Sequence, residues 1–353
     1  MILHCSIISY FCFKIISTMK SLLFLLSLVF LAAACNSDKR PVRSVSDYKR
    51  VSQDFNADSA YLYTERQTAF GPRVPNTEPH VACKNYLVEK LSQFGAEVSV
   101  QPAKVVKFNG DTLSIFNIIA SVNPNADTAI LLMAHWDTRF MADMCSIDSL
   151  KSKPIAGAND GAGSTAILLE IIRQMQLVPP TIRVDVVLFD AEDQGEPNSH
   201  RLETWCLGSD YWSKNPHKPN YKADLGILLD MVSGHNAFFT RESNSMHFAP
   251  NVMNEIWYLA ERLGYNESFS FQETHFVGID DHVPVNINLK IPSAAIIQYS
   301  EERKSFAEYW HTHNDHMDAV SKESLAKVGQ VLLELIYTYK RGAGTETETH
   351  RIN

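Results

Sequence analysis

Residues 184–195, with the sequence VDVVLFDAEDQG, constrain the fold more than any other part of the chain. The apolar, β-branched first half lacks the polar alternation of a half-exposed strand and is typical of a strand buried in a parallel sheet. The run stops abruptly at Asp190, Glu192 and Asp193. Open α/β sheets hold their chemistry beyond the carboxyl ends of such strands, so Glu192 and Asp193 are the first candidates for a functional role. A solvated turn is the alternative, but carboxylates beside apolar neighbours at the end of a core strand favour function.

Other apolar runs along the chain are followed by acidic or imidazole side chains in the same way. The small-residue loop 157–163 also places Asp160 at the entry of a predicted helix, where helix capping is the alternative role for a lone aspartate. Carboxylates gathered at one sheet edge would repel one another unless a cation neutralised them, and oxygen and imidazole donors without thiolates suit a catalytic Zn²⁺. The candidates of this kind are His135, Asp137, Asp160, Glu192, Asp193, Asp230 and the segment around His311.

The sequence alternates predicted strands with predicted helices. Continuous apolar runs indicate the strands, apolar residues spaced by three and four indicate the helices, and Asn109-Gly110 predicts a hairpin turn. This alternation predicts an α/β fold, a three-layer sandwich whose central mixed, mainly parallel twisted sheet is flanked by helices. Strands are predicted over 96–106, 112–122, 129–134, 184–189, 224–231 and 291–299, and helices over 59–70, 76–94, 164–176, 252–263 and 321–341, with another that starts at 207–212.

The first 35 residues predict a processing segment outside the fold. Met19 and Lys20 precede the apolar run 21–31, and the Ala-Ala-Ala-Cys that ends at Cys35 resembles a bacterial lipoprotein signal. Met19-Lys20 begins a complete signal by itself, so we expect translation to start at Met19. A transmembrane anchor is the alternative, but the run is short for a bilayer span, and we expect a lipid on Cys35 to anchor the protein at the cell envelope, facing the periplasm. We expect a tether over 36–54, a single catalytic domain over 55–341 and a tail over 342–353.

The composition narrows the possible partners. A formal net charge of −8 argues against a nucleic-acid partner, for which a basic surface would be expected. The 353 residues, 45% of them hydrophobic, can bury one large core, and we expect a monomer. Beyond Cys35 only Cys83, Cys145 and Cys206 remain, for which buried free thiols are expected and one disulfide is the alternative.

Five short blocks occur along the chain in a fixed order. They are His-x-Asp at 135–137, Asn-Asp-Gly at 159–161, Glu-Asp at 192–193, Leu-Asp-Met at 229–231 and Trp-His-Thr at 310–312. In this order they resemble the M28 zinc aminopeptidase superfamily, and within it the animal-type glutaminyl-peptide cyclotransferases of Bacteroidetes. The resemblance extends over about residues 59–339. It implies an acyltransferase that converts the N-terminal glutamine of peptides or proteins to pyroglutamate with release of ammonia.

The resemblance also implies which residues bind zinc and which transfer protons. Asp160, Asp193 and His311 would be the ligands of one Zn²⁺, which would polarise the γ-carbonyl of the glutamine. Glu192 would take a proton from the attacking α-amine and pass it to the departing ammonia. A water-poor pocket and neighbouring carboxylates would raise the pKa of Glu192 for this task.

The substrate would be held by further residues that match the family. Asp230 would bind the α-amine, with Asp280 hydrogen-bonded beside it. Trp310, together with Trp205 and Trp136, would form the walls of an apolar pocket for the glutamine side chain.

Two other functions stay open at this point. A two-zinc aminopeptidase is the first alternative, because His135 and Asp137 would either orient their neighbours or belong to a second metal site completed by Asp160 and Asp230. A non-catalytic peptide-binding protein is the second. It is suggested by Ala295, which stands where the animal-type cyclases carry a histidine or an acidic residue, although Gln298 could substitute.

Overall fold

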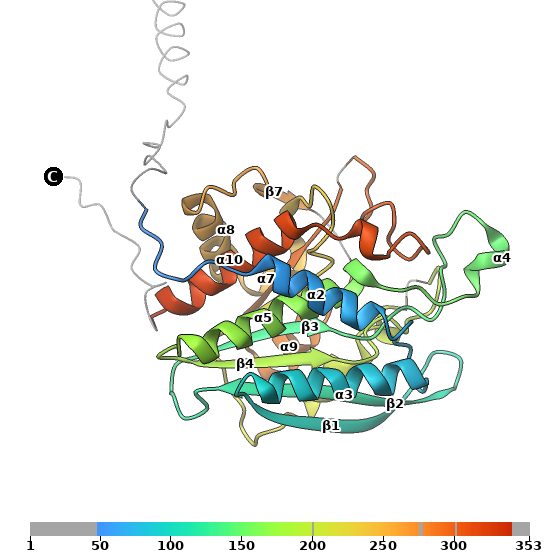
Figure 1. The fold of residues 1–353 in the computed structure, drawn as a ribbon. Helices are drawn as coiled ribbons and strands as arrows, with labels where there is room; N and C mark the ends of the chain where they lie inside the picture. The colour runs from blue at the N-terminus through green and yellow to red at the C-terminus, as the bar shows by residue number, and fades with distance from the viewer. Residues whose placement is uncertain (1–47, 200, 275–277, 301, 341–353) are drawn as a thin grey trace, which may run out of the picture. The chain divides into compact units, whose positions relative to one another are not determined.

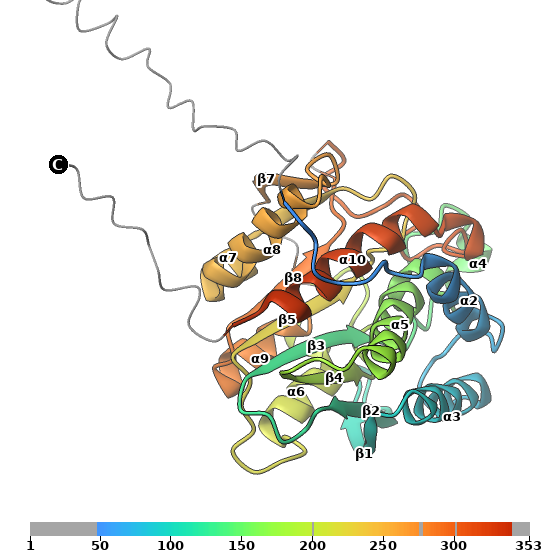
Figure 2. The same cartoon turned by 60° about the vertical axis from the view of Figure 1, so that its left-hand side comes forward.

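The computed structural model describes residues 48–340, apart from residues 200, 275–277 and 301. The central sheet contains β1 (Glu97–Val106), β2 (Thr112–Val122), β3 (Ala129–His135), β4 (Arg183–Phe189), β5 (Leu225–Asp230) and β8 (Ser293–Ile297). These six strands lie in the order β1-β2-β4-β3-β5-β8; Figure 1 labels the first four of this order and Figure 2 labels all six. β1 pairs antiparallel with β2 and β2 with β4, whereas β4, β3, β5 and β8 run parallel. The predicted mixed, mainly parallel sheet is therefore confirmed.

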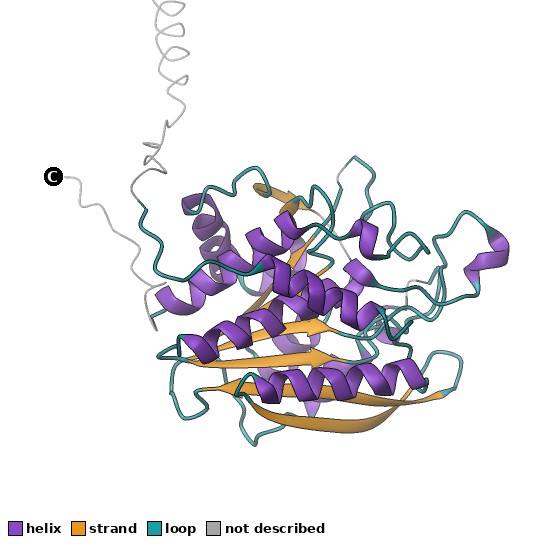
Figure 3. Cartoon of the chain, viewed as in Figure 1, coloured by secondary structure: helices purple, strands orange, loops and turns teal. Residues whose placement is uncertain are grey.

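Helices cover both faces of this sheet, as Figures 2 and 3 show. One face carries α2 (Ala57–Thr68), α3 (Glu78–Gln93), α5 (Ser164–Leu177) and α10 (Lys322–Thr338), and the other carries α6 (Leu207–Lys214) and α9 (His282–Leu289). The predicted three-layer sandwich is confirmed by this arrangement. Within the described part of the chain, no helix is both long and apolar enough to cross a membrane.

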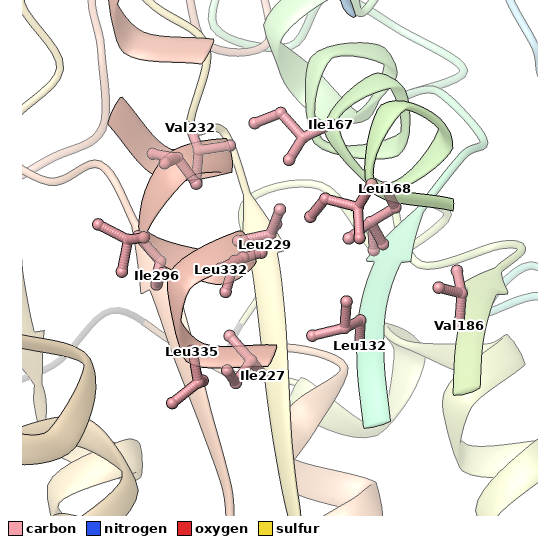
Figure 4. Packing of buried hydrophobic residues seen from close by; sticks show 14 of the residues in the cluster. Leu132, Ile167, Leu168, Val186, Ile227, Leu229, Val232, Ile296, Leu332 and Leu335 are labelled. Atoms are coloured by element: carbon pink, nitrogen blue, oxygen red, sulfur yellow. The ribbon is translucent and has the colours of Figure 1, made fainter. Parts of the chain in front are cut away.

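The apolar strand runs are explained by burial on both faces. Alternate side chains of the parallel strands point toward α5 and α10, where they form the larger core (Figure 4). The remaining side chains, such as Leu131, Met133 and Leu228, pack in a second cluster with Trp212 of α6 and Val285 of α9. Burying each large aliphatic side chain contributes roughly 1.5–3 kcal/mol. The larger core contains Leu132, Val186, Ile227, Leu229 and Ile296 of the sheet, Ile167 and Leu168 of α5, and Leu332 and Leu335 of α10.

Side-chain caps set the starts of three helices near the predicted positions. Asn56 Oδ1 accepts the Ser59 N–H at 3.0 Å, and Ser321 Oγ accepts the Ser324 N–H at 3.4 Å. Thr77 Oγ1 accepts the His80 N–H at 3.4 Å, so α3 begins at Glu78. Such a cap satisfies one of the amide groups that the first helical turn leaves without a partner.

A small second sheet was not predicted from the sequence. It pairs β6 (Phe239–Glu242) with β7 (Phe269–Thr274) in parallel, and α7 (Ser243–Phe248) and α8 (Pro250–Arg262) lie between them in the chain. Glu242, the last residue of β6, caps α7, because its carboxylate accepts the N–H groups of Asn244 and Ser245.

The short helix α4 (Asp148–Lys151) lies in the long connection after β3.

Candidate active site

The carboxyl ends of three parallel strands bring most of the predicted site residues together. His135 ends β3, Asp230 ends β5, and Glu192 and Asp193 lie in the turn that follows β4. Asp160 lies in a π-helical turn, Ala158–Gly163, at the entry of α5. His311 reaches the same edge from the loop after β8, so five separate segments of the chain meet there.

Asp160, Asp193 and His311 form one group of potential metal ligands. Their donor atoms all lie within 4.8 Å of one another, and all three side chains are buried. His311 Nε2 lies 3.0 Å from Asp193 Oδ1 and 3.7 Å from Asp160 Oδ2, and apart from His311 no described residue donates a hydrogen bond to the Asp193 carboxylate. Buried carboxylate oxygens without donors are costly unless a cation compensates them. Two carboxylates and one imidazole therefore fit a Zn²⁺ ion that keeps an open coordination position.

His135, Asp160 and Asp230 form a second group that shares Asp160 with the first. His135 Nε2 lies 2.9 Å from Asp160 Oδ1 and 3.1 Å from Asp230 Oδ1. Burial by itself would lower the pKa of His135, but hydrogen bonds with Asp137, Asp160 and Asp230 outweigh burial and raise this pKa well above its usual value. The imidazole thus already compensates the two carboxylates that a second ion would bind.

Glu192 lies at the pocket beside the first group but does not belong to either group of potential ligands. Burial raises the pKa of Glu192 well above its usual value, and Asp193, Asp280 and Asp281 raise it further, whereas His135 opposes the shift. A raised pKa lets the Glu192 carboxyl hold a proton more readily, which is the direction that a general acid and base requires.

Asp137 positions the turn that carries Glu192 and Asp193. Its carboxylate accepts the N–H groups of Glu192 at 3.1 Å and Asp193 at 3.3 Å, and the Gln194 Nε2 at 3.0 Å. Among the described residues, Asp137 is in neither group of potential metal ligands. The structure thus favours the predicted orienting role of Asp137 over a role as a second-metal ligand.

A pocket of about 190 Å³ opens beside these carboxylates, and two of the three predicted tryptophans line it. Trp310 stacks on His311 with ring centroids 3.9 Å apart, and it contacts Phe306 edge to face at 4.8 Å. The ring of Trp205 lies nearly parallel to that of His311, 6.1 Å away. Aromatic side chains therefore enclose the potential ligand His311.

The prediction that Trp136 lines the pocket is wrong. Trp136 is fully buried, stacks on His80 at 4.5 Å, and donates from Nε1 to the Phe116 carbonyl at 3.2 Å. Successive side chains of an extended segment point to opposite sides. His135 and Asp137 face the site, so Trp136 between them points away from it.

Asp230 and Asp280 both line the pocket, but the hydrogen bond predicted between them is absent from the described residues. Asp230 contacts His135, and Asp280 Oδ1 instead accepts the Asp281 N–H at 2.7 Å. Asp280 Oδ2 is buried, and none of the residues that the structure describes donates a hydrogen bond to it. Burial raises the pKa of Asp280 well above its usual value, and the charges of Asp230 and Asp281 add to this shift. The charge of Asp230 therefore affects the pKa of Asp280 without a hydrogen bond between them. Asp280 Oδ2 can accept a hydrogen bond from a ligand in the pocket.

Ala295 and Gln298 lie outside the pocket lining. Ala295 is buried in the core cluster that also contains Phe189 and Trp212, and Gln298 Oε1 accepts the Tyr309 hydroxyl at 3.5 Å. Gln298 therefore does not supply the acidic or imidazole group that Ala295 lacks. Asp281, the neighbour of the pocket residue Asp280, is buried, and burial raises the pKa of its carboxyl to about 7.

Two residues that orient the metal ligands were missed by the sequence analysis. Asp143 Oδ1 lies 3.1 Å from His311 Nδ1, and Arg139 binds the carboxylate of Asp143 and the carbonyls of Asp193 and Gly195. Asp315 accepts the N–H groups of Asn159 at 2.7 Å and Asp160 at 3.1 Å. Neither Asp143 nor Asp315 ends an apolar run, so no periodic pattern could indicate them.

Replacing Asp143 with asparagine is expected to weaken zinc binding by about 10–100-fold, since a residue that orients a metal-ligating histidine typically has an effect of this size. The measurement is competition for zinc between the apoprotein and a calibrated chelator. Asp148→Asn is the matched control, because the Asp148 carboxylate in the same connection is 91% exposed. Equal zinc affinities for Asp143→Asn and the control would show that Asp143 does not support His311.

The fold and the site together define a metal-dependent α/β enzyme whose reaction centre lies at the carboxyl edge of a parallel sheet. The sequence model of peptidase family M28 matches residues 117–336, and the chain belongs to this family.

Two solved structures are similar over nearly the whole described domain. The glutaminyl cyclase of Tannerella forsythia is 46% identical with a TM-score of 0.80, and the similarity covers 82% of this chain and 100% of that chain. A Zn-dependent exopeptidase from Parabacteroides distasonis is 44% identical with the same TM-score and the same coverage. Both the family and this neighbour support zinc as the metal.

More distant relatives carry two different activities in their names. The glutaminyl-peptide cyclotransferase of Bos taurus is 22% identical over 335 residues, which are 84% of this chain and 85% of that protein. Aminopeptidase YwaD of Bacillus subtilis is 26% identical over 195 residues, which are 54% of this chain. The chain spans only 39% of the length of that aminopeptidase.

Proposed function

We propose that the protein is a zinc-dependent glutaminyl-peptide cyclotransferase, which converts the N-terminal glutamine of peptides or proteins to pyroglutamate and releases ammonia. The observation that carries this proposal is the pocket in which Trp310 stacks on the potential ligand His311 and Glu192 lies beside the potential metal donors. Such a pocket holds one side chain together with its own backbone amine. The full-length similarity to a glutaminyl cyclase supports the same reaction.

Zinc, held by Asp160, Asp193 and His311, would supply a Lewis acid that polarises the side-chain carbonyl of the glutamine. Asp230 and Asp280 hold the α-amine near this carbonyl, because their carboxyl groups line the same pocket. The α-nitrogen forms a bond to the side-chain amide carbon and the bond from that carbon to the amide nitrogen breaks. Glu192 accepts the proton from the α-amine and returns it to the leaving nitrogen, which departs as ammonia.

This reaction suits the site because its nucleophile is already tethered to the electrophile. An intramolecular attack avoids the entropic cost of bringing two molecules together. It also needs no bound water as the nucleophile. Trp205 and Trp310 narrow the pocket around the reacting side chain.

A two-zinc aminopeptidase is the second candidate, and the group formed by His135, Asp160 and Asp230 favours it. Hydrolysis needs a metal-activated water, which a position between two ions supplies. His135 Nε2 lies 2.9 Å from Asp160 Oδ1 and His311 Nε2 lies 3.0 Å from Asp193 Oδ1, so the two groups have similar geometry and the measured metal content decides between one ion and two.

Assays of two substrates distinguish these functions. The purified protein is expected to release ammonia from a glutaminyl peptide, to release no leucine from a leucyl peptide, and to contain one equivalent of zinc. Two equivalents of zinc together with leucine release would instead establish the aminopeptidase. Binding of the glutaminyl peptide without either product would indicate a non-catalytic peptide-binding protein.

We also propose that the protein is a monomeric lipoprotein of the bacterial cell envelope that faces the periplasm. The lipoprotein-like signal that ends at Cys35 supports this, although Cys35 lies outside the described residues. Mass spectrometry of the native N-terminus tests the proposal, and an unmodified Cys35 would refute it.

A further inference from the structure

The thiol of Cys206 contacts the carboxylate of Glu192. Cys206 Sγ lies 3.4 Å from Glu192 Oε1, within the range of a hydrogen bond to sulfur. In the described part of the chain, no other side chain makes a hydrogen bond with this carboxylate. Asp137, by contrast, binds only the backbone N–H of Glu192. Asp137 therefore holds only the backbone of Glu192, whereas Cys206 contacts its reactive carboxylate.

The backbone around Cys206 keeps the thiol in this place. The Cys206 N–H donates to the Glu192 carbonyl at 3.0 Å, and the Leu207 N–H donates to the Ala191 carbonyl at 3.1 Å. Cys206 has a left-handed backbone with φ of 55° and is fully buried. Two backbone bonds thus hold the Cys206 segment antiparallel to the turn that carries Glu192.

A thiol suits a carboxylate that must gain and lose a proton in each turnover. Burial raises the pKa of Cys206 well above its usual value, and the charge of Glu192 adds to this shift, so the sulfur keeps its hydrogen. A thiol is a weaker hydrogen-bond donor than a hydroxyl or a charged group. It contacts only Oε1 and can therefore fix the direction of the carboxylate while Oε2 remains to accept the substrate proton.

We propose that Cys206 is a positioning residue that aims the Glu192 carboxylate at the substrate amine by donating its S–H hydrogen bond to Oε1. The role in turnover rests on the cyclase function proposed above. The hydrogen bond itself rests only on the geometry of the two side chains.

The kinetic test compares three variants of the full-length protein. Cys206→Ala is expected to lower kcat about tenfold, the net worth of one hydrogen bond, and to leave KM within about twofold because the thiol does not touch the substrate. Cys206→Ser is expected to restore most of kcat, since its hydroxyl can donate to the same carboxylate. Cys83→Ala is the matched control, because it removes another fully buried sulfur on α3 and is expected to leave kcat unchanged. A serine variant as slow as the alanine variant, or an alanine variant as fast as wild type, would overturn the proposal.

Infrared spectroscopy tests the hydrogen bond without reference to any reaction. The S–H stretching band that disappears in Cys206→Ala is expected to move to higher frequency in Glu192→Ala, because the thiol then loses its acceptor. This result would stand even if the protein catalysed a different reaction, so failure of the proposed function is distinguishable from failure of this inference. A band that stays in place in Glu192→Ala would overturn it.

Discussion

Replacing Glu192 with glutamine is expected to lower turnover by about 10²–10⁴-fold while zinc stays bound, which is the usual size of a general acid and base contribution. The amide keeps the shape of the side chain and can still accept from the Cys206 thiol, but it cannot shuttle a proton. Zinc should remain because Glu192 belongs to neither group of potential ligands. The measurements are ammonia release at saturating glutaminyl peptide and metal analysis of the same preparation.

The matched control for this variant is Glu203→Gln. The Glu203 carboxylate lies in the connection between β4 and α6 and is 68% exposed, so its neutralisation should leave both turnover and zinc content unchanged. Loss of zinc from Glu192→Gln would show that Glu192 is a ligand and that the assigned roles of Glu192 and Asp193 are exchanged.

Replacing Asp193 with alanine is expected to remove zinc and, with it, nearly all activity. Asp193 contributes a buried carboxylate to which, among the described residues, only His311 lies close enough to donate, so a bound cation would compensate its charge. The loss of zinc affinity should exceed the roughly 10–100-fold that is typical of residues that only orient a ligand. Chelator competition measures the affinity, and Asp148→Ala, which changes an exposed carboxylate, is the control.

The fold should tolerate this substitution. Burial raises the pKa of Asp193 to about 6 and Asp160 raises it further, whereas His311 opposes the shift, so removing the Asp193 carboxylate from the metal-free protein relieves one repulsion and loses one attraction. Circular dichroism and thermal unfolding of the apoprotein are therefore expected to match wild type. An Asp193→Ala protein that folds, retains one equivalent of zinc and still turns over would contradict the assignment of this ligand.

Several strands could be predicted from the sequence because an apolar run without polar residues indicates a strand that is buried on both faces. The runs of β3, β4 and β5 have no polar alternation, and each lies in the middle of the sheet with helices on both faces. The hairpin of β1 and β2 was predicted from Asn109-Gly110, and ten residue pairs form its antiparallel ladder. β6 and β7 escaped prediction because they are short strands whose pairing depends on segments far apart in the chain.

The candidate site likewise contains residues that the sequence predicted correctly and one that it did not. Asp160, Glu192, Asp193 and Asp230 lie at or beyond the ends of core elements, which is where the sequence pattern placed them. The assignment of Trp136 failed because neighbouring positions in an extended segment face opposite sides, and the sequence does not say which side faces the pocket.

Apolar periodicity and the polar residues that interrupt it were enough to establish the α/β class, the sheet edge that bears the chemistry and the residue types of a zinc site. They were enough because burial of a strand or helix face is a local property that repeats along the chain. The partners that aim each group, such as Asp143 toward His311 and Cys206 toward Glu192, became visible only in the folded chain. These contacts join connections with no periodic pattern, and their geometry depends on how the whole sheet and its helices pack.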